Sequence, residues 1–475
     1  MKKLFALLLT LAMILSLVAC GASNETPNDQ AQNETPVATE QTPSDDAAVE
    51  NAAEGTTIRL FMSNSTKTLN DVQALAEKYY QETGNKVIVE PAVKGDNYNT
   101  KSVLLMQDTE NCPDIIREDG FRVRNDAAAG YLLNLDSYLA EWEDYDKMTD
   151  TLMDGVKGSD GSVYALPHSA DTVVIWYNAD VTEAAGLGRD WQPKSWQDVL
   201  DAANAMKKAF ADDPDFVPMF HYASSNNIEA TSMRTFQVLY AGTGSKLYDY
   251  DANQWVVDHA ALKDVLGFVD QAWNQDGLCS IELGSNSDGG AIITNDLLPN
   301  GKIGMVFTIG STIKTGLANA GDLWGPKLED GTIKYCNVPS KDSADYVTMC
   351  GGWTWAIPAN SKNKDAAWEF MKYLFTVESQ ATLSAGYSLP TRDDVWEHEI
   401  WTSQPYGEMF EGFRETMDFA RFRDSVEGYD TATALFASAI ENVAFGLMSV
   451  EEAIENFETE MVGGMGADRV QVINK

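Results

Sequence analysis

Motifs for catalysis and for metal binding are missing from this sequence in their common forms. It contains no G-x-S-x-G nucleophile elbow, no H-E-x-x-H zinc motif and no G-x-x-x-x-G-K-[ST] phosphate loop. Two carboxylates suited to glycoside hydrolysis could arise anywhere in so acidic a chain, so they carry no information. The histidines are too scattered for a metal site or a catalytic triad: His168, His221, His259 and His398. We therefore expect no cofactor and no metal.

The cysteines beyond position 20 also give no sign of a metal site. They include no C-x-x-C pair and stand far apart, at Cys112, Cys279, Cys336 and Cys350. Cys336 and Cys350 flank what we interpret as one loop and one strand. In an oxidising compartment these two thiols could form a disulfide or remain unpaired.

The first residues carry a motif whose chemistry is covalent modification. Two lysines precede an apolar run over residues 4–15, which is too short to span a bilayer, and Cys20 follows small or apolar residues. This pattern predicts a lipoprotein signal peptide over residues 1–19 and a lipid attached to Cys20. Two acyl chains hold a protein on a membrane where one chain barely does. An ordinary cleaved signal with an incidental cysteine is the alternative.

Residues 20–55 are predicted to form a disordered acidic linker. Positions 21–55 hold eight acidic residues and no Lys or Arg, and the phrase Asn24–Pro27 recurs as Asn33–Pro36. Such a polar, repetitive composition cannot build a hydrophobic core, and its like charges and prolines keep the chain extended.

The whole chain is strongly acidic, with 72 Asp and Glu against 34 Lys and Arg and a formal net charge of −38. A surface of this charge repels nucleic acid, which we exclude as a partner. It could indicate cation binding or simply a soluble acidic exterior, and we favour the second interpretation.

The elements that must position any site alternate between strands and helices. The β-rich run Thr57–Phe61 is followed by an expected helix over residues 69–83, capped by Thr68. Later amphipathic segments predict helices that begin at the caps Ser195 and Ser449, and short apolar runs between them predict buried strands. This alternation predicts an α/β fold with sheets rich in parallel strands, whose ligand sites lie at strand carboxyl ends.

Several phrases between Arg59 and Ala453 occur in a characteristic order. They are RLFMSNSTKTLNDVQALAEKYYQET from Arg59, Pro113–Ile116, Gly130–Leu135, Asp160–Pro167, Trp176–Asp180, Pro193–Trp196, Gly301–Met305, IPANSKNKDAAWEFMKYL from Ile357, Leu389–Arg392 and Ser449–Ala453. Together they resemble the family 1 extracellular solute-binding proteins, which are maltose-binding-protein-like, sugar-capturing lipoproteins of ABC importers.

The resemblance implies a two-lobed α/β fold of the type II periplasmic-binding-protein kind, with several chain crossings at a hinge and the ligand between the lobes. It places the hinge at Ser169, at Gly351 and Gly352, and at Leu389. Glycines suit a hinge because their backbone tolerates the angles that a hinge must sweep, although the pair also suits a plain turn. The expected lobes are residues 56–170 with 351–390 (lobe 1) and residues 171–350 with 391–475 (lobe 2).

A sugar cleft needs aromatic rings against the sugar ring faces, and carboxylates, amides or arginines against the hydroxyl rim. Trp353 and Trp355 alternate with Thr354 on the strand after the glycine pair, so both indoles lie on one face of a sheet. We expect Trp353 to border the cleft and Trp355 to belong to the core.

The resemblance also implies polar ligand contacts in the loop after Pro113–Ile116 and just after the first crossing. Asp119 and Arg122 in that loop and Asp171 after the crossing are the candidates, with surface salt bridges or a hinge cap as alternative roles. Glu118 stands where relatives have an aromatic ring, and this difference argues against a maltose-like binding pose. Further candidates, each with a structural role as the alternative, are Ser63, Asn64, Thr312, Tyr387 and Tyr429.

We expect a lipid-anchored receptor on the extracellular face of a bacterial cell membrane. It would capture a carbohydrate, above all an oligosaccharide, and deliver it to the permease subunits of an ABC importer, acting as a monomer and catalysing no reaction. Two alternatives stay open: a receptor for another polar solute, such as a polyol or an amino-sugar, and a surface-anchored glycoside hydrolase.

The anchor generates the first testable prediction. Cys20→Ala removes the thiol that would carry the thioether, so this variant should appear in the medium or remain unprocessed, whereas the wild-type protein fractionates with membranes. Immunoblots of membrane and medium fractions measure the difference. Equal membrane retention of both proteins would contradict the lipoprotein interpretation.

Overall fold

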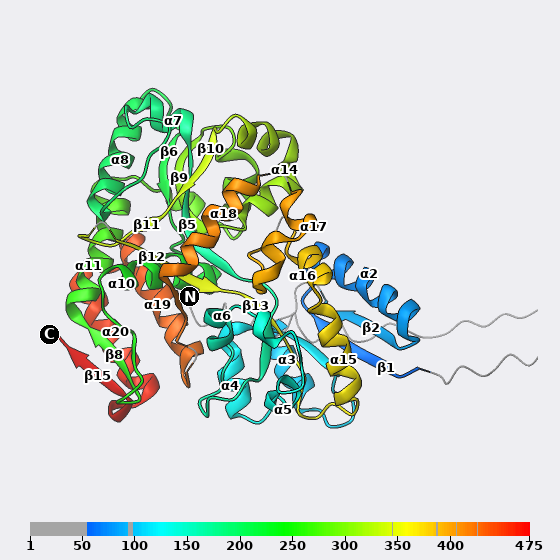
Figure 1. The fold of residues 1–475 in the computed structure, drawn as a ribbon. Coiled ribbons are helices and arrows are strands. Elements are labelled where there is room, and N and C mark those ends of the chain that lie inside the picture. Colours follow the sequence, from blue (N-terminus) through cyan, green and yellow to red (C-terminus); the bar gives the residue numbers. More distant parts are fainter. Residues whose placement is uncertain (1–54, 94–97, 344, 386–387, 405, 425) are drawn as a thin grey trace, which may run out of the picture. The chain divides into compact units, whose positions relative to one another are not determined.

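The computed structural model describes residues 55–93, 98–343, 345–385, 388–404, 406–424 and 426–475 (Figure 1). The predicted signal peptide over residues 1–19, the lipidation site Cys20 and the linker over residues 20–55, apart from Gly55, lie outside this part, as does the candidate Tyr387. Among the described helices, none combines the length and the apolar character needed to cross a membrane.

One part of the fold, which we call lobe 1, contains a five-stranded sheet. Its strands are β1 (Thr57–Met62), β2 (Lys86–Pro91), β3 (Ile115–Asp119), β4 (Ala165–Pro167) and β13 (Trp353–Ala356). Its helices are α2 (Thr66–Thr83), α3 (Tyr98–Gln107), α4 (Val123–Ala128), α5 (Asp136–Leu139), α6 (Asp150–Asp154), α15 (Lys364–Leu374) and α16 (Val377–Ser384). The strand order is β2-β1-β3-β13-β4, and α2 packs against β2 on one side and against α15 and α16 on another (Figure 1).

The other part, lobe 2, contains a larger sheet in the order β11-β12-β5-β9-β6, with β10 paired to β5 and β14 paired to β12. These strands are β5 (Asp171–Asn178), β6 (Val217–Phe220), β9 (Ile303–Ile309), β10 (Ile333–Cys336), β11 (Val338–Pro339), β12 (Tyr346–Gly351) and β14 (Ala420–Phe422). A small sheet is added by β7 (Tyr248–Asp249), β8 (Gln254–Asp258) and β15 (Val470–Ile473), in the order β15-β8-β7.

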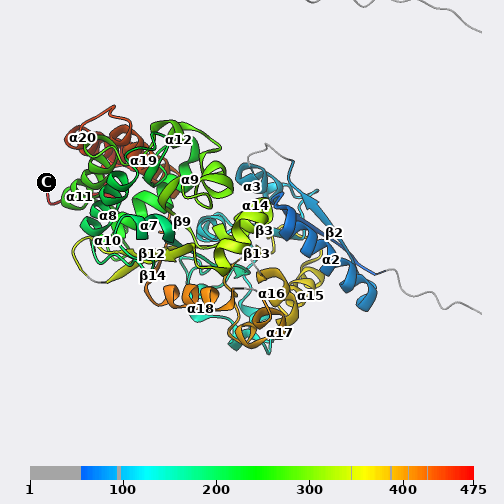
Figure 2. The ribbon, with the colours of Figure 1, turned by 90° about the horizontal axis from the view of Figure 1, so that it is seen from above.

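Helices make up most of the rest of lobe 2. They are α7 (Ala179–Ala184), α8 (Trp196–Ala209), α9 (Ile228–Thr231), α10 (Val238–Gly242), α11 (His259–Asp270), α12 (Ile281–Ser285), α13 (Gly289–Ile292), α14 (Thr312–Glu329), α17 (Glu399–Thr402), α18 (Gly407–Glu415), α19 (Tyr429–Ala444) and α20 (Val450–Met465). Helices α11, α19 and α20 pack against one another and lie together in both views of the ribbon (Figures 1 and 2).

The alternation of strands and helices confirms the predicted α/β class, but the prediction of sheets rich in parallel strands is wrong. β13 enters lobe 1 from lobe 2 and therefore runs antiparallel to β3 and β4. In lobe 2, β5 has antiparallel neighbours in β9, β10 and β12, while the parallel pairs are β6 with β9 and β12 with β14. Strands that arrive by crossing from the other lobe need not follow the βαβ rule.

Helix caps were predicted well from local sequence. The Ser195 side chain accepts a hydrogen bond from the backbone of Asp198 at the start of α8, and Ser449 forms a capping box with Glu452 at the start of α20. Helix α2 differs from the prediction, because it begins after Ser65 and includes Thr68 in its first turn. Backbone bonding decides this point, since the amide of Leu69 already bonds to the carbonyl of Ser65 at 2.8 Å.

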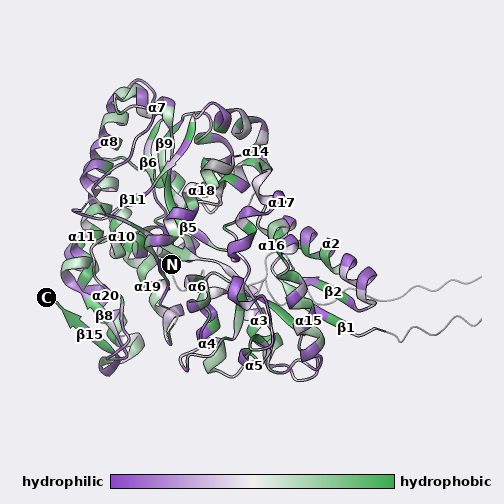
Figure 3. Ribbon diagram, in the orientation of Figure 1, coloured by the Kyte–Doolittle hydropathy of each residue, from purple (hydrophilic) through white to green (hydrophobic). Residues whose placement is uncertain are grey.

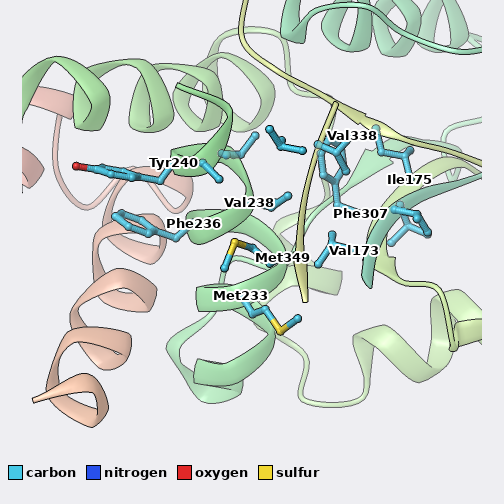
Figure 4. Close-up of a cluster of buried hydrophobic side chains, with 14 of the residues drawn as sticks. Val173, Ile175, Met233, Phe236, Val238, Tyr240, Phe307, Val338 and Met349 are labelled. Carbon is cyan, nitrogen blue, oxygen red and sulfur yellow. The ribbon is translucent and has the colours of Figure 1, made fainter. Parts of the chain in front are cut away.

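Each lobe has its own apolar core, and strands at the centre of the lobes are coloured as hydrophobic in Figure 3. Trp355 is fully buried in the core of lobe 1, as expected. In lobe 2, Phe236 and Tyr240 stack with ring centres 5.6 Å apart, and Phe236 also stacks on Phe436 of α19 at 4.5 Å. Val238 lies between these two rings and Val173 and Phe307 of the sheet (Figure 4). Of the described cysteines, Cys336 and Cys350 are buried and free, so the possible disulfide is not formed.

Three chain crossings between the sheets meet side by side. The chain leaves β4 for β5 through Ser169, and it leaves β12 for β13 through Gly352. The Ser169 hydroxyl accepts a hydrogen bond from the Trp353 amide at 3.1 Å, and Ala170 forms an antiparallel bridge with Leu389. A Cβ atom on Gly352 would lie 2.0 Å from the Ser169 carbonyl oxygen, so glycine is required for this close approach.

That contact predicts a stability difference between two glycine variants. Gly352→Ala should lower the free energy of unfolding by about 1–3 kcal/mol, because the methyl group meets backbone atoms that cannot move independently. Gly463→Ala is the control: it lies inside α20 with no atom near its Cβ position and should be neutral or stabilising by about 0.5–1 kcal/mol. Urea unfolding followed by circular dichroism measures both, and equal stability of the two variants would contradict the close approach.

Candidate ligand-binding site

A polar cavity of about 370 Å³ lies where the strand ends of the two lobes meet. This volume is within the range of about 300–1,000 Å³ that is common for small-molecule sites. Its charged and aromatic lining residues come from both lobes: Arg117, Asp119 and Trp353 from lobe 1, and Asp171, Glu229, Arg234, Lys314 and Arg423 from lobe 2. We call this cavity the cleft.

A larger hollow of about 810 Å³ lies within lobe 2 and is lined by Tyr177, Trp191, Tyr335 and other residues of that lobe. Two of its charged lining residues, Lys334 and Asp190, already form an ion pair with each other. Lobe 1 contributes no side chain to this hollow among the described residues, so we regard the cleft as the candidate site.

Arg117, near the end of β3, is the most deeply held basic residue of the cleft, with 5% of its surface exposed. Its Nε donates to Nε2 of His168 at 3.0 Å, and its Nη1 donates to the Ser63 hydroxyl at 2.7 Å. Burial lowers the pKa of Arg117 to about 10. Burial and the nearby guanidinium also hold the pKa of His168 well below its usual 6.5, so this imidazole is a neutral acceptor.

Trp353, the first residue of β13, packs against the same arginine. The Arg117 guanidinium carbon lies 4.2 Å from the centre of the indole, and the ring of Tyr98 meets the indole at 5.9 Å, tilted by 64°. Trp355 points into the core on the same strand and stacks on His168 at 4.8 Å. Trp353 therefore holds Arg117 in place, and Trp355 holds its hydrogen-bond partner His168.

Asp171, the first residue of β5, stands at the start of α14. Its Oδ1 accepts hydrogen bonds from the amides of Thr172 at 3.0 Å and Ser311 at 3.1 Å, and its Oδ2 accepts one from the Ser311 hydroxyl. Burial raises the pKa of Asp171 to about 6, although these hydrogen bonds and the charge of Arg234 oppose the rise.

Arg423 joins the lobes by ion pairs. Its Nη2 lies 2.7 Å from Oδ1 of Asp119 in lobe 1, and its Nη1 bonds to the carboxylate of Glu229 in lobe 2. Burial raises the pKa of Asp119 to about 6, with Arg423 acting in the opposite direction. The Phe121 ring, 4.5 Å from the guanidinium, covers the pair.

The structure brings several of the predicted site residues together and separates others. Ser63, Asp119, Asp171 and Trp353 line the cleft, as do Ser169, Gly351 and Gly352, which were predicted as hinge residues. Leu389 lies beside them through its bridge to Ala170. The candidates that do not line the cleft are Asn64, Glu118, Arg122, Thr312 and Tyr429.

Glu118 and Arg122 have a structural reason for lying elsewhere. Side chains on β3 alternate between its faces, so Glu118 points away from Arg117 and Asp119 and is fully buried. Arg122 forms ion pairs with Glu118 at 3.2 Å, with Asp126 at 3.3 Å and with Asp430 of lobe 2 at 3.4 Å. Burial and the negative charge of Asp126 hold the pKa of Glu118 well above its usual 4.5.

The other two buried candidates are held by contacts within lobe 2. The Thr312 hydroxyl lies 3.3 Å from the Thr308 hydroxyl. Tyr429 is fully buried, and its hydroxyl accepts a hydrogen bond from Gln237 at 2.9 Å. Asn64, by contrast, is exposed at the end of the loop before α2.

Sequence reasoning missed the basic side of the cleft. Arg117 directly follows the apolar pair Ile115–Ile116, and a charge at that place in a buried strand was the available signal. Arg234, Lys314 and Arg423 gave no such signal, because they reach the cleft from separate segments of lobe 2.

The fold and the cleft can be compared with known proteins. The model of the bacterial extracellular solute-binding protein family matches residues 63–381. The chain belongs to this family. One relative, a maltooligosaccharide ABC transporter solute-binding lipoprotein of Streptococcus pneumoniae serotype 4, is 23% identical over 66% of this chain and 67% of its own length.

Solved structures of family members share the fold of this solute-binding protein. A solute-binding protein of Thermotoga lettingae TMO bound with alpha-D-tagatose has a TM-score of 0.72 at 20% identity, over 87% of this chain and 100% of that one. The GacH receptor of Streptomyces glaucescens GLA.O, solved unliganded and with acarbose, has a TM-score of 0.71 at 22% identity, over 87% and 99%. These likenesses confirm the predicted two-lobed, type II fold.

The raised pKa of Asp171 predicts a pH dependence of stability. A carboxyl whose folded pKa is about 6 and whose unfolded pKa is lower binds more protons when folded, so its contribution to stability falls as pH rises from 4 to 7. Asp171→Asn can keep the two hydrogen bonds that Oδ1 accepts from backbone amides, and its side-chain amide can donate to the Ser311 hydroxyl instead of accepting from it, but it does not titrate. The free energy of unfolding of the wild type, relative to this variant, should fall by up to about 3 kcal/mol across that interval.

Asp258 provides a control with the opposite sign. Burial raises its pKa, but hydrogen bonds from Asn474, Ser245 and the start of α11 outweigh this effect and lower the pKa overall. The wild type should therefore gain stability relative to Asp258→Asn as pH rises through the acidic range. Urea titrations at several pH values measure both differences. If the difference in stability between the wild type and Asp171→Asn does not change with pH, the pKa of Asp171 is not raised by burial.

Proposed function

We propose that this solute-binding protein is a lipid-anchored receptor that captures a carbohydrate in the cleft and delivers it to the permease of an ABC importer. Binding is its only chemistry in this proposal. The lipid on Cys20 would keep it at the extracellular face of the membrane, and the linker over residues 20–55 would give it reach.

The observation that carries the proposal is a polar cleft whose charged groups come from both lobes and meet at three adjacent chain crossings. Side chains such as Asp171 and Trp353 lie within a few residues of these crossings. A ligand held by both lobes gains its full set of contacts only when the lobes are close, so binding and closure favour each other. A permease that recognises the closed form would then select the loaded receptor.

The lobe boundaries belong to the same proposal. We place them at residues 170/171, 350/351 and 390/391. The first falls between β4 and β5, which belong to different sheets, and the second falls just before Gly351, the last residue of β12 and close to the start of β13. At the third, Arg392 still contacts lobe 1 by an ion pair with Asp144 at 2.9 Å, which supports a hinge strand rather than a sharp boundary.

A carbohydrate is the ligand class that the relatives favour. The pneumococcal relative is named for maltooligosaccharides, and the two solved structures hold tagatose and acarbose. In this chain Trp353 supplies an aromatic surface, and Ser63, Asp119 and Asp171 supply groups for hydroxyls. Another polar solute remains the alternative. Such a solute would need hydrogen bonds, as a carbohydrate does, but it would not need an aromatic ring to pack against.

Trp353→Ala tests the carbohydrate proposal at its aromatic surface. The variant should bind its saccharide at least about tenfold more weakly, because a ring contact of about 1.4 kcal/mol is lost, with little change in the urea midpoint. Tyr80→Ala, which truncates an exposed ring on α2, is the control and should leave binding unchanged.

The measurement is a thermal-shift screen against a saccharide panel, followed by calorimetric titration of the saccharides that stabilise the protein. Solution scattering should show a more compact particle with ligand, and chromatography should recover that ligand intact. Cleaved ligand would replace the receptor by a hydrolase. Unchanged binding by Trp353→Ala would remove the indole from the ligand contacts.

A further inference from the structure

The cleft reverses the charge balance of the chain. The whole sequence holds about two acidic residues for each basic one, with a formal net charge of −38. The lining of the cleft holds four basic residues, Arg117, Arg234, Lys314 and Arg423, against the three acidic residues Asp119, Asp171 and Glu229. A lining with more basic than acidic residues, in so acidic a protein, favours an anion over a cation as the ligand.

The carboxylates of the cleft are already matched by the protein. Asp119 and Glu229 share the guanidinium of Arg423. Asp171 accepts hydrogen bonds from the amides of Thr172 and Ser311 and from the Ser311 hydroxyl. These acidic groups therefore have little capacity left for a cationic ligand.

The two other arginines of the cleft form hydrogen bonds with neutral groups, although the charge of Arg234 also acts on Asp171. Arg117 donates to the Ser63 hydroxyl and to the neutral imidazole of His168. Arg234 donates through Nη1 to the hydroxyls of Tyr222 at 3.3 Å and Thr308 at 3.0 Å. Neither guanidinium forms an ion pair with a carboxylate of the described residues. A buried cation without a counter-charge is costly, and an anion brought by the ligand would remove that cost.

Two further features favour an anion at the same place. Burial and the positive charge of Arg117 lower the pKa of Lys314, in the first turn of α14, to about 8, which shows that basic groups converge there. The 18-residue helix α2 begins at the cleft, where Ser65 and Thr68 line it, and its first turn holds no acidic residue. The N-terminus of a helix favours negative charge.

The aromatic lining is sparse by comparison. Trp353 is the single tryptophan, tyrosine or phenylalanine among the described lining residues. The guanidinium of Arg117 lies over its ring, 4.2 Å from the ring centre. A long neutral oligosaccharide, which needs a series of ring platforms, fits this lining less well than a short saccharide with a charged group.

We propose that the ligand of the cleft is a short anionic saccharide, whose carboxylate or phosphate group lies among Arg117, Arg234 and Lys314. This inference rests on the proposed carbohydrate receptor and names its ligand class. Trp353 then packs against the sugar ring, and Asp171 accepts a hydrogen bond from a hydroxyl. The shared chemistry is a localised negative charge, which a uronate or a sugar phosphate can supply.

Matched probes test the charge and separate its two sources. D-glucose, D-glucuronate and D-glucose 6-phosphate differ at the sixth carbon alone, and galactobiose and digalacturonate form a second neutral and anionic pair. Calorimetric titration should show that an anionic member binds at least about tenfold more tightly than its neutral partner. Its affinity should also fall as NaCl is added. The uronate and phosphate arms then identify which anion is preferred.

Single-residue variants test whether the charged group of the ligand binds in the cleft. Lys314→Gln and Arg234→Gln should each weaken the anionic probe by about tenfold, because each loses one charge-assisted hydrogen bond, and should weaken the neutral partner of that probe much less. Lys327→Gln, near the other end of α14, is the matched control and should bind as the wild type does.

The possible failures are distinguishable. The anionic ligand is contradicted if a neutral saccharide binds as tightly as its anionic partner, or if Lys314→Gln does not change the affinity for the anionic probe. Neither result contradicts the carbohydrate receptor. If no neutral or anionic saccharide binds, the proposed function itself is contradicted.

Discussion

The close packing of the Ser169 carbonyl against Gly352 is the constraint on which the cleft depends. It holds the crossing from β4 to β5 against the crossing from β12 to β13, so strand ends of both sheets meet at one place. A side chain at position 352 would force these backbones apart. Asp171 and Trp353, which flank the crossings, reach one cavity because of this contact.

Burial determines the electrostatics of the cavity. The Arg117 guanidinium is held by His168, by Ser63 and by the face of Trp353, with no carboxylate paired to it among the described residues. In a site of low dielectric such a charge interacts strongly with any anion that enters. The same surroundings raise the pKa of Asp171 and Asp119, so these carboxylates are costly to charge in the cleft. A ligand that binds the folded protein alone should stabilise the fold.

Two ion pairs join the lobes near the cleft. Arg423 of lobe 2 bonds to Asp119 of lobe 1, and Arg122 of lobe 1 bonds to Asp430 of lobe 2. Each pair depends on the distance between the lobes, and Asp119 also lines the cleft. In the proposed receptor, a ligand that alters the charge around Asp119 would act on one of these pairs directly and so would affect the distance between the lobes.

Local sequence determined the parts of this protein that depend on near neighbours. The α/β class, the caps at Ser195 and Ser449 and the burial of Trp355 follow from patterns within a few residues, and the ordered phrases indicated the family. Candidates close to strand ends and crossings, such as Ser63, Asp171 and Trp353, line the cavity, and their role in ligand binding stays a prediction. Local backbone geometry fixes these features, so short-range patterns suffice to predict them.

Tertiary structure alone decided which side of the cleft is basic. Arg234, Lys314 and Arg423 stand far apart in the sequence, and pairing of strands that cross between lobes brings them together. The same pairing made the sheets mixed rather than mainly parallel, and strand alternation turned Glu118 toward Arg122 and away from the cavity. The sequence determined which charges the protein has, but pairing across long sequence separations decided which of them face the ligand, because burial and counter-charges exist only in the folded chain.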